Sequence, residues 1–336
     1  MKILLVSGFL GAGKTTFIKA LSQNTHKDFA VLENEYGQAA IDGTVLSENG
    51  TVGNIDALTN ENSDSEQNKK INIWEMTEGC ICCSMKKDFS ASILTLSNVI
   101  DPEYLVVEPT GVGKPGNILS NVKQILYDRI SLLAPITIVD GNLFDRQISE
   151  FPDIYIDQIK TASKVLISKM ENADPNDLQI LENKIHEYNP SCKVITQHYS
   201  KLSPKDWMSF LKTSFDGQIL SSTPEEDTDL ETIGLTDVGC PTEVELIYFL
   251  ERVIRYEFGN IVRAKGYLPV GKQWLKFDVT DGRYIITGIE EQKDSRCVFI
   301  GKSLDRSKIR KQMLFSLYKQ SNLSKLTSIP TKPIAE

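Results

Sequence analysis

The chain has 336 residues, of which 40% are hydrophobic and 24% charged, and its formal net charge is -8 at pH 7. This length exceeds what most single hydrophobic cores sustain and predicts two domains, with the composition of an ordinary globular protein. The acidic balance argues against nucleic acid as a partner. The sequence contains no run of about 18 apolar residues, the length that a membrane-spanning helix needs. The apolar segment at its start is short and leads into glycines and a lysine, so it does not resemble a secretory signal. We therefore expect a cytoplasmic protein that binds neither nucleic acid nor membrane.

The first chemical motif follows directly on an apolar run. Lys2 to Ser7 predicts a buried strand, Lys14 to Leu21 predicts a helix, and the pattern G-x-x-x-x-G-K-T joins them through Gly8, Gly13, Lys14 and Thr15. In such a loop the backbone N–H groups converge on the β- and γ-phosphates, the lysine neutralises charge and the threonine hydroxyl reaches Mg²⁺. The sequence thus predicts a P-loop nucleotide hydrolase.

Strand-like and helix-like segments then alternate along the chain. This order predicts an α/β fold, a P-loop NTPase domain with a mostly parallel sheet flanked by helices. The predicted strands are Phe29 to Glu33, Ile71 to Met76, Tyr104 to Glu108, Ala134 to Asp140, Lys164 to Lys169 and Lys193 to Thr196, and the predicted helices include Phe89 to Ile100, Gly116 to Tyr127 and Pro175 to Tyr188.

Two of these strands end in a carboxylate. Glu108 closes one strand and is followed by Pro-Thr-Gly; in P-loop hydrolases such an acid holds Mg²⁺ or its water, and the next glycine, here Gly111, can turn its amide toward the γ-phosphate. Asp140 ends the other strand. It is either a functional acid or a residue that only forms a turn, and both interpretations stay open. Glu35 lies after the second strand, where it is either a switch-loop acid near a metal or a solvated residue.

Base recognition is expected at Ser168-Lys169-Met170-Glu171, which ends another strand. The segment resembles the N-K-x-D motif, in which the acid accepts from the N1 and N2 donors of guanine and the lysine stem covers the ring. Ser168 replaces the Asn whose amide braces the loop, and Glu171 replaces Asp, which moves the carboxylate outward by a methylene. Bidentate acceptance stays available, so the motif predicts GTP in preference to ATP.

The most distinctive feature is a cysteine cluster, Cys80-Ile81-Cys82-Cys83. Thiolates are soft ligands that suit Zn²⁺ and related metals, and a chain without an export signal favours metal binding over disulfides. Buried apolar cysteines are the alternative, because neighbouring residues of a strand point to opposite faces. The cluster predicts a metal site in which Cys80 and Cys82 are ligands and the participation of Cys83 stays open.

A polar, acidic stretch separates two predicted domains. Residues 216–241 hold seven acidic residues and neither Lys nor Arg, which predicts a solvated linker between a domain at 1–215 and a smaller α+β domain at 242–336. Residues 60–70 are polar throughout and predict an exposed insertion. In the second domain we expect a capped helix at Leu246 to Tyr256, strands at Ile261 to Leu268, Gln273 to Thr280, Arg283 to Gly288 and Arg296 to Ile300, and a basic helix at Asp305 to Tyr318.

Taken together, these motifs resemble the CobW family of P-loop metallochaperone GTPases, which is related to HypB and UreG. The residues that carry the resemblance are the P-loop, Glu33 to Gly37 (E-N-E-Y-G), Gly79 to Cys83 (G-C-I-C-C), Val106 to Gly111 (V-V-E-P-T-G), Ser168 to Glu171, Arg263 to Gly266 (R-A-K-G) and Val298 to Gly301 (V-F-I-G). They span nearly the whole chain, including a CobW C-terminal-like domain.

The resemblance implies a GTPase that loads a transition metal and delivers it to a client metalloprotein or a cofactor-biosynthesis enzyme. It implies GTP, Mg²⁺ and either Zn²⁺ or Co²⁺ as ligands, and it leaves the oligomeric state, a homodimer included, open. The implied nucleotide-binding residues are Gly8, Gly11, Ala12, Gly13, Lys14, Thr15, Thr16, Gly111, Ser168, Lys169 and Glu171. The resemblance also implies that Lys14, Thr15 and Glu108 act in catalysis and that Thr15 and Glu108 bind Mg²⁺. The implied ligands of the transition metal are Glu35, Cys80, Cys82 and Cys83.

The chain departs from the family pattern in three places. Gln38 stands where an acid is expected after Gly37, the base-reading motif is altered, and only three histidines occur, which argues against zinc storage. Three alternatives stay open: a P-loop kinase of a small acceptor, a non-catalytic nucleotide-gated metal-binding module, and a nickel-insertion GTPase, which would not explain the C-terminal domain.

Overall fold

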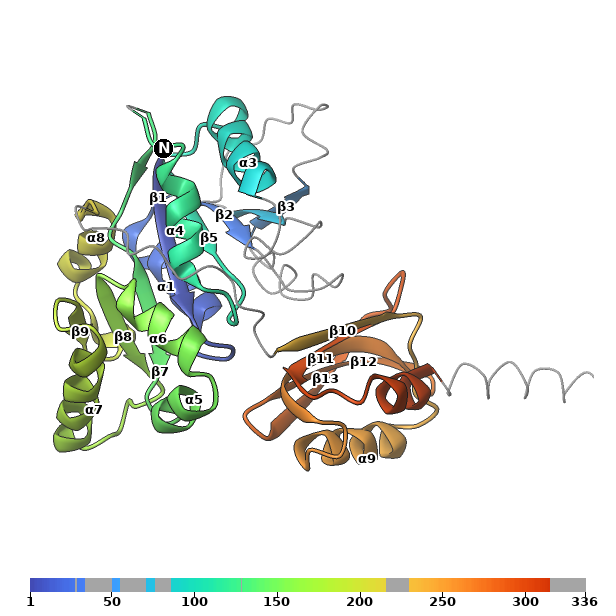
Figure 1. Ribbon diagram of the computed structural model, residues 1–336. Coiled ribbons are helices and arrows are strands. Elements are labelled where there is room, and N and C mark those ends of the chain that lie inside the picture. Colours follow the sequence, from blue (N-terminus) through green and yellow to red (C-terminus); the bar gives the residue numbers. More distant parts are fainter. Residues whose placement is uncertain are drawn as a thin grey trace, which may run out of the picture. The chain divides into compact units, whose positions relative to one another are not determined.

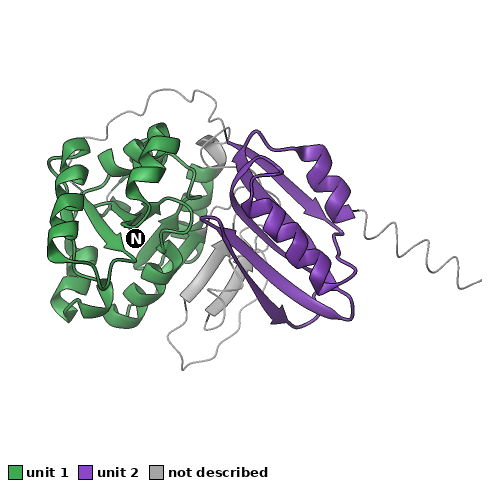
Figure 2. Cartoon of the chain, turned by 90° about the horizontal axis from the view of Figure 1, so that it is seen from below, with its two compact units in different colours: residues 1–36, 40–226 green, residues 37–39, 227–336 purple. Residues whose placement is uncertain are grey.

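The computed structural model describes residues 1–27, 29–33, 50–54, 71–75, 86–127, 129–215 and 230–314. The chain divides into a first unit that runs to Glu226 and a second that starts at Asp227 (Figures 1 and 2). The described part of the first unit is built on a parallel sheet, and that of the second on an antiparallel sheet. The predicted fold class, an α/β P-loop domain with a smaller α+β domain, is confirmed.

The sheet of the first unit has the order β3-β4-β2-β5-β1-β7-β8-β9, with β6 also paired to β1. All of these pairings are parallel. The strands are β1 (Lys2–Gly8), β2 (Phe29–Glu33), β3 (Gly50–Asn54), β4 (Ile71–Glu75), β5 (Tyr104–Glu108), β6 (Ser131–Leu132), β7 (Ile136–Asp140), β8 (Lys164–Ser168) and β9 (Lys193–Ile195). Because the strands are parallel, their carboxyl ends, where the predicted site residues lie, meet at one edge of the sheet.

Helices cover both faces of this sheet (Figure 1). They are α1 (Lys14–Thr25), α3 (Lys86–Val99), α4 (Pro115–Lys123), α5 (Phe144–Glu150), α6 (Pro152–Lys160), α7 (Pro175–Tyr188) and α8 (Pro204–Lys212), with a 3-10 turn, η3, at Tyr199–Lys201. The predicted elements agree with these to within a few residues. Sequence patterns did not show β3, β6, α5, α6, η3 or α8, because these elements are short or polar.

Alternating residues of β1 explain why the sheet is buried on both sides. Leu4 and Val6 belong to a core that includes Phe17 of α1 and Trp207 of α8. The intervening Ile3 and Leu5 belong to a second core with residues of α3 and α4. A strand buried on both faces reads as a continuous apolar run, which is the pattern that the sequence shows.

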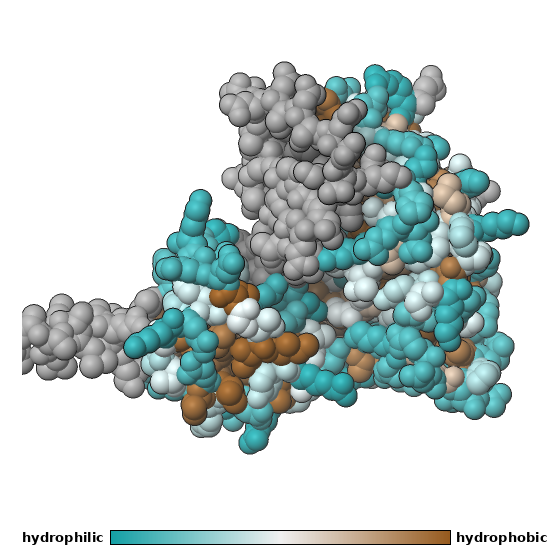
Figure 3. All heavy atoms as spheres, turned by 180° about the vertical axis from the view of Figure 1, so that it is seen from behind, coloured by the Kyte–Doolittle hydropathy of each residue, from teal (hydrophilic) through white to brown (hydrophobic). Residues whose placement is uncertain are grey.

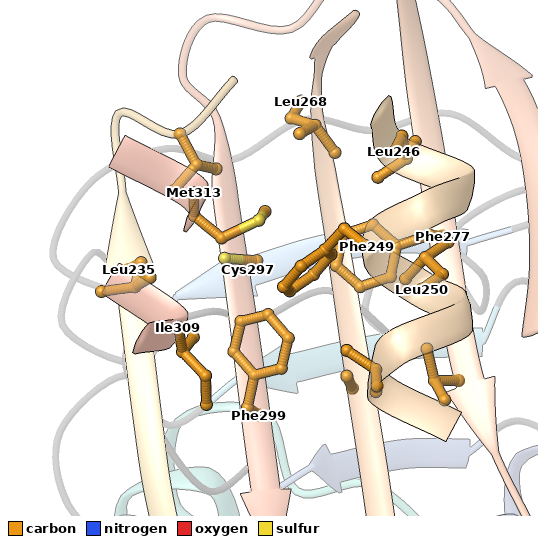
Figure 4. Close-up of a cluster of buried hydrophobic side chains, with 14 of the residues drawn as sticks. Leu235, Leu246, Phe249, Leu250, Leu268, Phe277, Cys297, Phe299, Ile309 and Met313 are labelled. Carbon is orange, nitrogen blue, oxygen red and sulfur yellow. The ribbon is translucent and has the colours of Figure 1, made fainter. Parts of the chain in front are cut away.

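The second unit is a five-stranded antiparallel sheet with the order β10-β14-β11-β12-β13. Its elements are β10 (Glu231–Thr236), α9 (Glu243–Ile254), β11 (Asn260–Val270), β12 (Gln273–Thr280), β13 (Arg283–Ile289) and β14 (Arg296–Lys302), and residues 306–314 are helical. One sheet face packs against α9 in a core that includes Phe249, Phe277, Cys297 and Phe299 (Figure 4). The N-cap of α9 is Thr242, whose hydroxyl accepts the Glu245 N–H at 3.2 Å.

The predicted linker at 216–241 is wrong in its last part. Residues 231–236 form β10, an edge strand paired with β14, rather than solvated chain. The reason is an alternation within the acidic stretch, where Ile233 and Leu235 are buried between more exposed neighbours. Residues 216–229 lie outside the described residues, as does the insertion predicted at 60–70, so the domain boundary stays a prediction.

The surface of the second unit displays apolar side chains among polar ones (Figure 3). Val244, Ile247 and Tyr248 of α9 are exposed, as is Ile285 of β13. Within the described residues, no helix has the length and apolar character that crossing a bilayer requires.

The core of the second unit generates a stability prediction at Gly266, the last residue of R-A-K-G. A Cβ there would lie 2.5 Å from a Phe277 ring carbon and 2.7 Å from Cys297 Cβ. We expect Gly266→Ala to lower the free energy of unfolding by about 1–3 kcal/mol, the usual cost of overpacking. Gly288→Ala is the matched control, since nothing lies within 4 Å of its Cβ position. Urea denaturation compares the two, and equal stabilities would contradict the packing argument.

Candidate nucleotide site

The loop between β1 and α1 has a backbone that depends on its glycines. Gly8, Gly11 and Gly13 have φ angles of 144°, 77° and 99°. A Cβ on Gly8 would also lie 2.3 Å from the Ile138 carbonyl oxygen of β7. Side chains are therefore excluded from the turn both by its conformation and by the neighbouring strand. We call residues 8–15 the P-loop.

The start of α1 faces this loop without a side-chain cap. Gly13 is the N-cap, no side chain makes a capping hydrogen bond to it, and the first turn contains no acidic residue. The first N–H groups of a helix carry a partial positive charge and need acceptors, so this end of α1 suits an anion. Ala12 is buried and Thr16 is exposed in the first turn.

Lys14 lies folded over the P-loop. Its ammonium donates to the carbonyl oxygens of Gly8 at 3.0 Å and Phe9 at 3.3 Å, and the residue is 7% exposed. The lysine charge is thus held at the rim of the loop in which the sequence predicts the phosphates.

Thr15 and Glu108 meet across the sheet edge. The Thr15 hydroxyl donates to Glu108 Oε1 at 3.1 Å, and Glu108 is buried at the end of β5. A hydroxyl and a carboxylate beside a phosphate cradle are hard oxygen donors of the kind that Mg²⁺ prefers. The residues present therefore fit an Mg²⁺ ion bound together with a nucleotide.

The turn after Glu108 lies against the P-loop. A Cβ on Gly111 would be 2.5 Å from the Leu10 nitrogen, so the backbones of the two segments approach more closely than any larger residue allows. The Val112 N–H donates to the Thr110 hydroxyl at 3.4 Å, and the Gly113 N–H to the Thr110 carbonyl at 2.9 Å, which closes a tight turn. Gly111 is thus placed beside the predicted phosphate site.

Ser168 keeps a bracing role despite lacking an amide. Its hydroxyl lies 2.7 Å from the carbonyl oxygen of Ala12 and 3.1 Å from that of Val139, and it links the end of β8 to the P-loop. The Ser168 hydroxyl therefore supplies a hydrogen bond to the P-loop in place of those expected from the amide of an Asn.

Lys169 and Asp140 form an ion pair beside this contact. Lys169 Nζ lies 2.7 Å from Asp140 Oδ2, and the Asp140 side chain is buried. The other carboxylate oxygen accepts the Asn142 N–H at 3.1 Å, while the Asn142 amide donates to the Lys169 carbonyl at 2.6 Å. Asp140 therefore both forms a turn and positions Lys169, whose φ is 62°. The contribution of Asn142 left no sequence signal.

Glu171 has a partner that the sequence did not indicate. Its Oε1 lies 3.0 Å from His198 Nε2, and the His198 ring packs on Tyr199 with centroids 4.1 Å apart. His198 precedes η3, close after β9, so its position near Glu171 follows from the parallel pairing of β8 and β9. The Glu171 carboxylate raises the pKa of Tyr199, although desolvation of the phenol is the larger cause.

The predicted metal ligands Cys80, Cys82, Cys83 and Glu35 lie outside the described residues. Among residues that are described, no three His, Cys, Asp or Glu side chains are placed to share a metal ion. Cys192, Cys240 and Cys297 are free thiols in separate places. Burial raises the pKa of Cys192 and of Cys240 to about 11, which disfavours the thiolate form that binds metals.

Comparison with known proteins identifies the family. The model "CobW/HypB/UreG, nucleotide-binding domain" matches residues 2–196, more than half of the chain. The model "Cobalamin synthesis protein cobW C-terminal domain" matches residues 231–315. The chain belongs to the CobW family.

Several members of the CobW family are similar along most of the chain. The zinc chaperone YjiA of Escherichia coli is 25% identical, over 92% of this chain and 96% of that protein. The zinc chaperone CobW of Pseudomonas aeruginosa is 24% identical, over 94% and 92%. A crystal structure of Zn(II)-bound YjiA GTPase from E. coli matches at 22% identity with a TM-score of 0.45, over 93% of this chain and 97% of that one.

A half-buried carboxylate lies at the back of the site in this CobW-family protein. Asp157 Oδ2 of α6 accepts the Gly116 N–H at 3.1 Å. Desolvation raises the pKa of Asp157, and the Gly116 amide and the Lys114 and Lys160 charges offset this only in part. The charged form is thus less favourable in the folded protein than in the unfolded chain.

This shift predicts a pH-dependent stability difference. A carboxyl group with a raised folded-state pKa stabilises the fold below its ordinary value of 3.8 and loses that contribution as the pH rises through the folded value. Asp157→Asn keeps an acceptor for Gly116 but does not titrate. We expect the free energy of unfolding of Asp157→Asn, minus that of wild type, to be larger at pH 7 than at pH 4 in urea denaturation, because only the wild type loses stability as its carboxyl group ionises. A constant difference across that range would contradict the prediction.

Proposed function

We propose that this protein is a cytoplasmic metallochaperone that hydrolyses GTP and delivers zinc to a client metalloprotein or a cofactor-biosynthesis enzyme. The observation that carries the proposal is the Thr15–Glu108 pair, which lies at the mouth of a P-loop that already holds Lys14 at its rim. This combination supplies a cation, an Mg²⁺ site and an uncapped helix start at one place. The protein's membership of the CobW family supports the link between this site and metal delivery.

The phosphate chemistry follows from the charges in the site. The Lys14 ammonium exchanges its contacts with the Gly8 and Phe9 carbonyls for phosphate oxygens, and the N–H groups of the P-loop and α1 donate hydrogen bonds to the remaining phosphate oxygens. Thr15 and Glu108 would hold Mg²⁺, and the ion would supply positive charge to stabilise the transferring phosphoryl group. Water attacks the γ-phosphorus in line while the bond from that phosphorus to the β–γ bridging oxygen breaks, and the products are GDP, inorganic phosphate and a proton that passes to solvent.

In this proposal guanine binds at the carboxyl ends of β7 and β8, beside Lys169 and Glu171. Lys169, pinned by Asp140, provides the stem that covers the base, and Glu171 provides the acceptor for the N1 and N2 donors. The contact with His198 keeps the longer Glu171 side chain in one direction. Ser168 fixes this segment to the P-loop through Ala12, so base and phosphate recognition share one support.

Zinc is the cargo that we favour. Cys80, Cys82 and Cys83 are soft donors that suit Zn²⁺, and Glu35 adds a carboxylate to the metal-sensing loop. The relatives similar along nearly the whole chain are zinc chaperones, which favours zinc over a nickel-insertion role. Cobalt suits the same donors and is the second metal to test.

The nucleotide assignment predicts a specific loss of activity. Wild-type protein with Mg²⁺ is expected to hydrolyse GTP in preference to ATP, and Lys14→Ala to lower kcat/KM by about a hundredfold or more, because the charge that meets the phosphates is removed. Phosphate release measures both. Glu171→Ala is expected to weaken GDP binding while leaving ADP binding unchanged, which separates base recognition from phosphate binding.

The same assay tests the other functional classes. A P-loop kinase would make a phosphorylated acceptor instead of free phosphate and would be indifferent to Cys80→Ser. A non-catalytic module would bind GTP but release no phosphate above background even with zinc and client present. Either outcome would overturn the proposed hydrolysis.

The cargo assignment makes a separate prediction. Wild-type protein, reduced and desalted under anaerobic conditions, is expected to bind Zn²⁺ more tightly with a non-hydrolysable GTP analogue than without it, and the analogue more tightly with Zn²⁺ by the same factor. Cys80→Ser and Cys82→Ser should each lose the tight site, whereas Cys240→Ser should not. Competition with a chromogenic chelator gives the affinities, and equal affinities with and without the analogue would contradict the coupling.

A further inference from the structure

A buried glutamine lies behind the turn that follows Glu108. Gln158 of α6 is 1% exposed, and its Nε2 donates to the carbonyl oxygens of Gly111 at 3.0 Å and Gly113 at 3.3 Å. These carbonyls belong to the turn whose other side lies against Leu10 of the P-loop. The turn is therefore held between the P-loop and α6.

Gln158 is itself tied to the strand that carries the P-loop. The Thr137 hydroxyl of β7 lies 2.7 Å from the Gln158 carbonyl oxygen and 2.8 Å from the Ser7 hydroxyl. Ser7 directly precedes Gly8. A continuous chain of hydrogen bonds thus runs from β1 through β7 and α6 to the turn, and it holds the turn in register with the phosphate site.

The neighbouring residue of α6 holds the far end of the same segment. Asp157 accepts the Gly116 N–H at the start of α4, three residues after Gly113. Two consecutive residues of one helix therefore fix both ends of residues 111–116. A displacement of the turn would have to break the Gln158 contacts, the Asp157 contact, or both.

We infer that Gln158 is a positioning residue for GTP hydrolysis, which keeps the 111–113 turn where its backbone meets the γ-phosphate. This inference rests on the proposed function. Gln158 does not touch the nucleotide; it acts through the carbonyl groups of Gly111 and Gly113. GDP, which has no γ-phosphate, gains nothing from the position of this turn, so Gln158 discriminates between the triphosphate and diphosphate states.

The geometry identifies which part of the side chain matters. Oε1 of Gln158 has no hydrogen-bond partner among the described residues, so the effect comes from Nε2 alone. Met has a similar length and no donor, and it would remove the hydrogen bonds from Gln158 Nε2 to both carbonyls. Glu would place a carboxylate against those carbonyls, which adds repulsion. The expected order of effect is therefore Glu greater than Met.

The test compares Gln158→Met and Gln158→Glu with Gln147→Met. Gln147 of α5 is also buried, and neither polar atom of its amide has a partner within the described residues, so it controls for loss of a buried glutamine. We expect Gln158→Met to lower kcat and the affinity for a non-hydrolysable GTP analogue about tenfold, the equivalent of one or two hydrogen bonds. GDP affinity should change less than about twofold, and Gln147→Met should match wild type.

Two results would overturn the inference. One is an unchanged kcat and analogue affinity in Gln158→Met. The other is an equal loss of GDP and analogue affinity together with a lower melting temperature, which a purely structural role would produce. Absence of GTP hydrolysis in the wild type would instead contradict the proposed function, and the comparison of analogue with GDP binding still measures whether the turn senses the γ-phosphate.

Discussion

The absence of side chains at Gly8 and Gly111 is the constraint on which the site depends. The P-loop backbone touches the Ile138 carbonyl of β7 on one side and the Gly111 turn on another, and its Ala12 carbonyl lies within hydrogen-bonding distance of Ser168 of β8. A Cβ on Gly8 or Gly111 would clash with backbone atoms of the neighbouring segment, and the Ser168 hydroxyl adds a hydrogen bond, so this packing tolerates little displacement. The ends of three strands are thereby fixed relative to one loop.

This close packing explains why the site can combine distant segments. Lys14 and Thr15 follow the first strand, Glu108 ends β5, and Lys169 and Glu171 follow β8. Each reaches the same edge because parallel strands place their carboxyl ends together. The direct contacts of Gly111 and Ser168 with the P-loop then convert general proximity into defined geometry.

The sequence predicted the layers of the first unit well because strands buried on both faces, such as Tyr104–Glu108, read as continuous apolar runs. It predicted β10 as linker because acidic composition outweighed a short alternation of two buried residues, Ile233 and Leu235. It also gave no warning of α5 and α6, which are separated only by Phe151 and begin or end near a proline. Short helices stabilised by tertiary packing carry little local signal.

Some features of the candidate site could likewise be predicted from the sequence, and others could not. The P-loop is contiguous, so the spacing of Gly8, Gly13, Lys14 and Thr15 was enough to predict where it lies and what these residues do. The pairing of Glu171 with His198, and of Gln158 with carbonyls more than forty residues away, depends on tertiary structure and leaves no pattern in the chain. The altered base-reading motif shows the limit most clearly, because the loss of Asn was visible in the sequence whereas the hydroxyl contact from Ser168 to Ala12 was not.

The bare start of α1 has a consequence for the protein when nucleotide is scarce. A helix with glycine at its N-cap forgoes roughly a few tenths of a kcal/mol that a serine or aspartate would contribute. A bound phosphate group fills that role instead, so the folded state is reinforced by mass action in proportion to the logarithm of ligand concentration. Depletion of the cellular guanine nucleotide pool would thus weaken the fold itself and expose the empty protein to proteolysis before the loaded one.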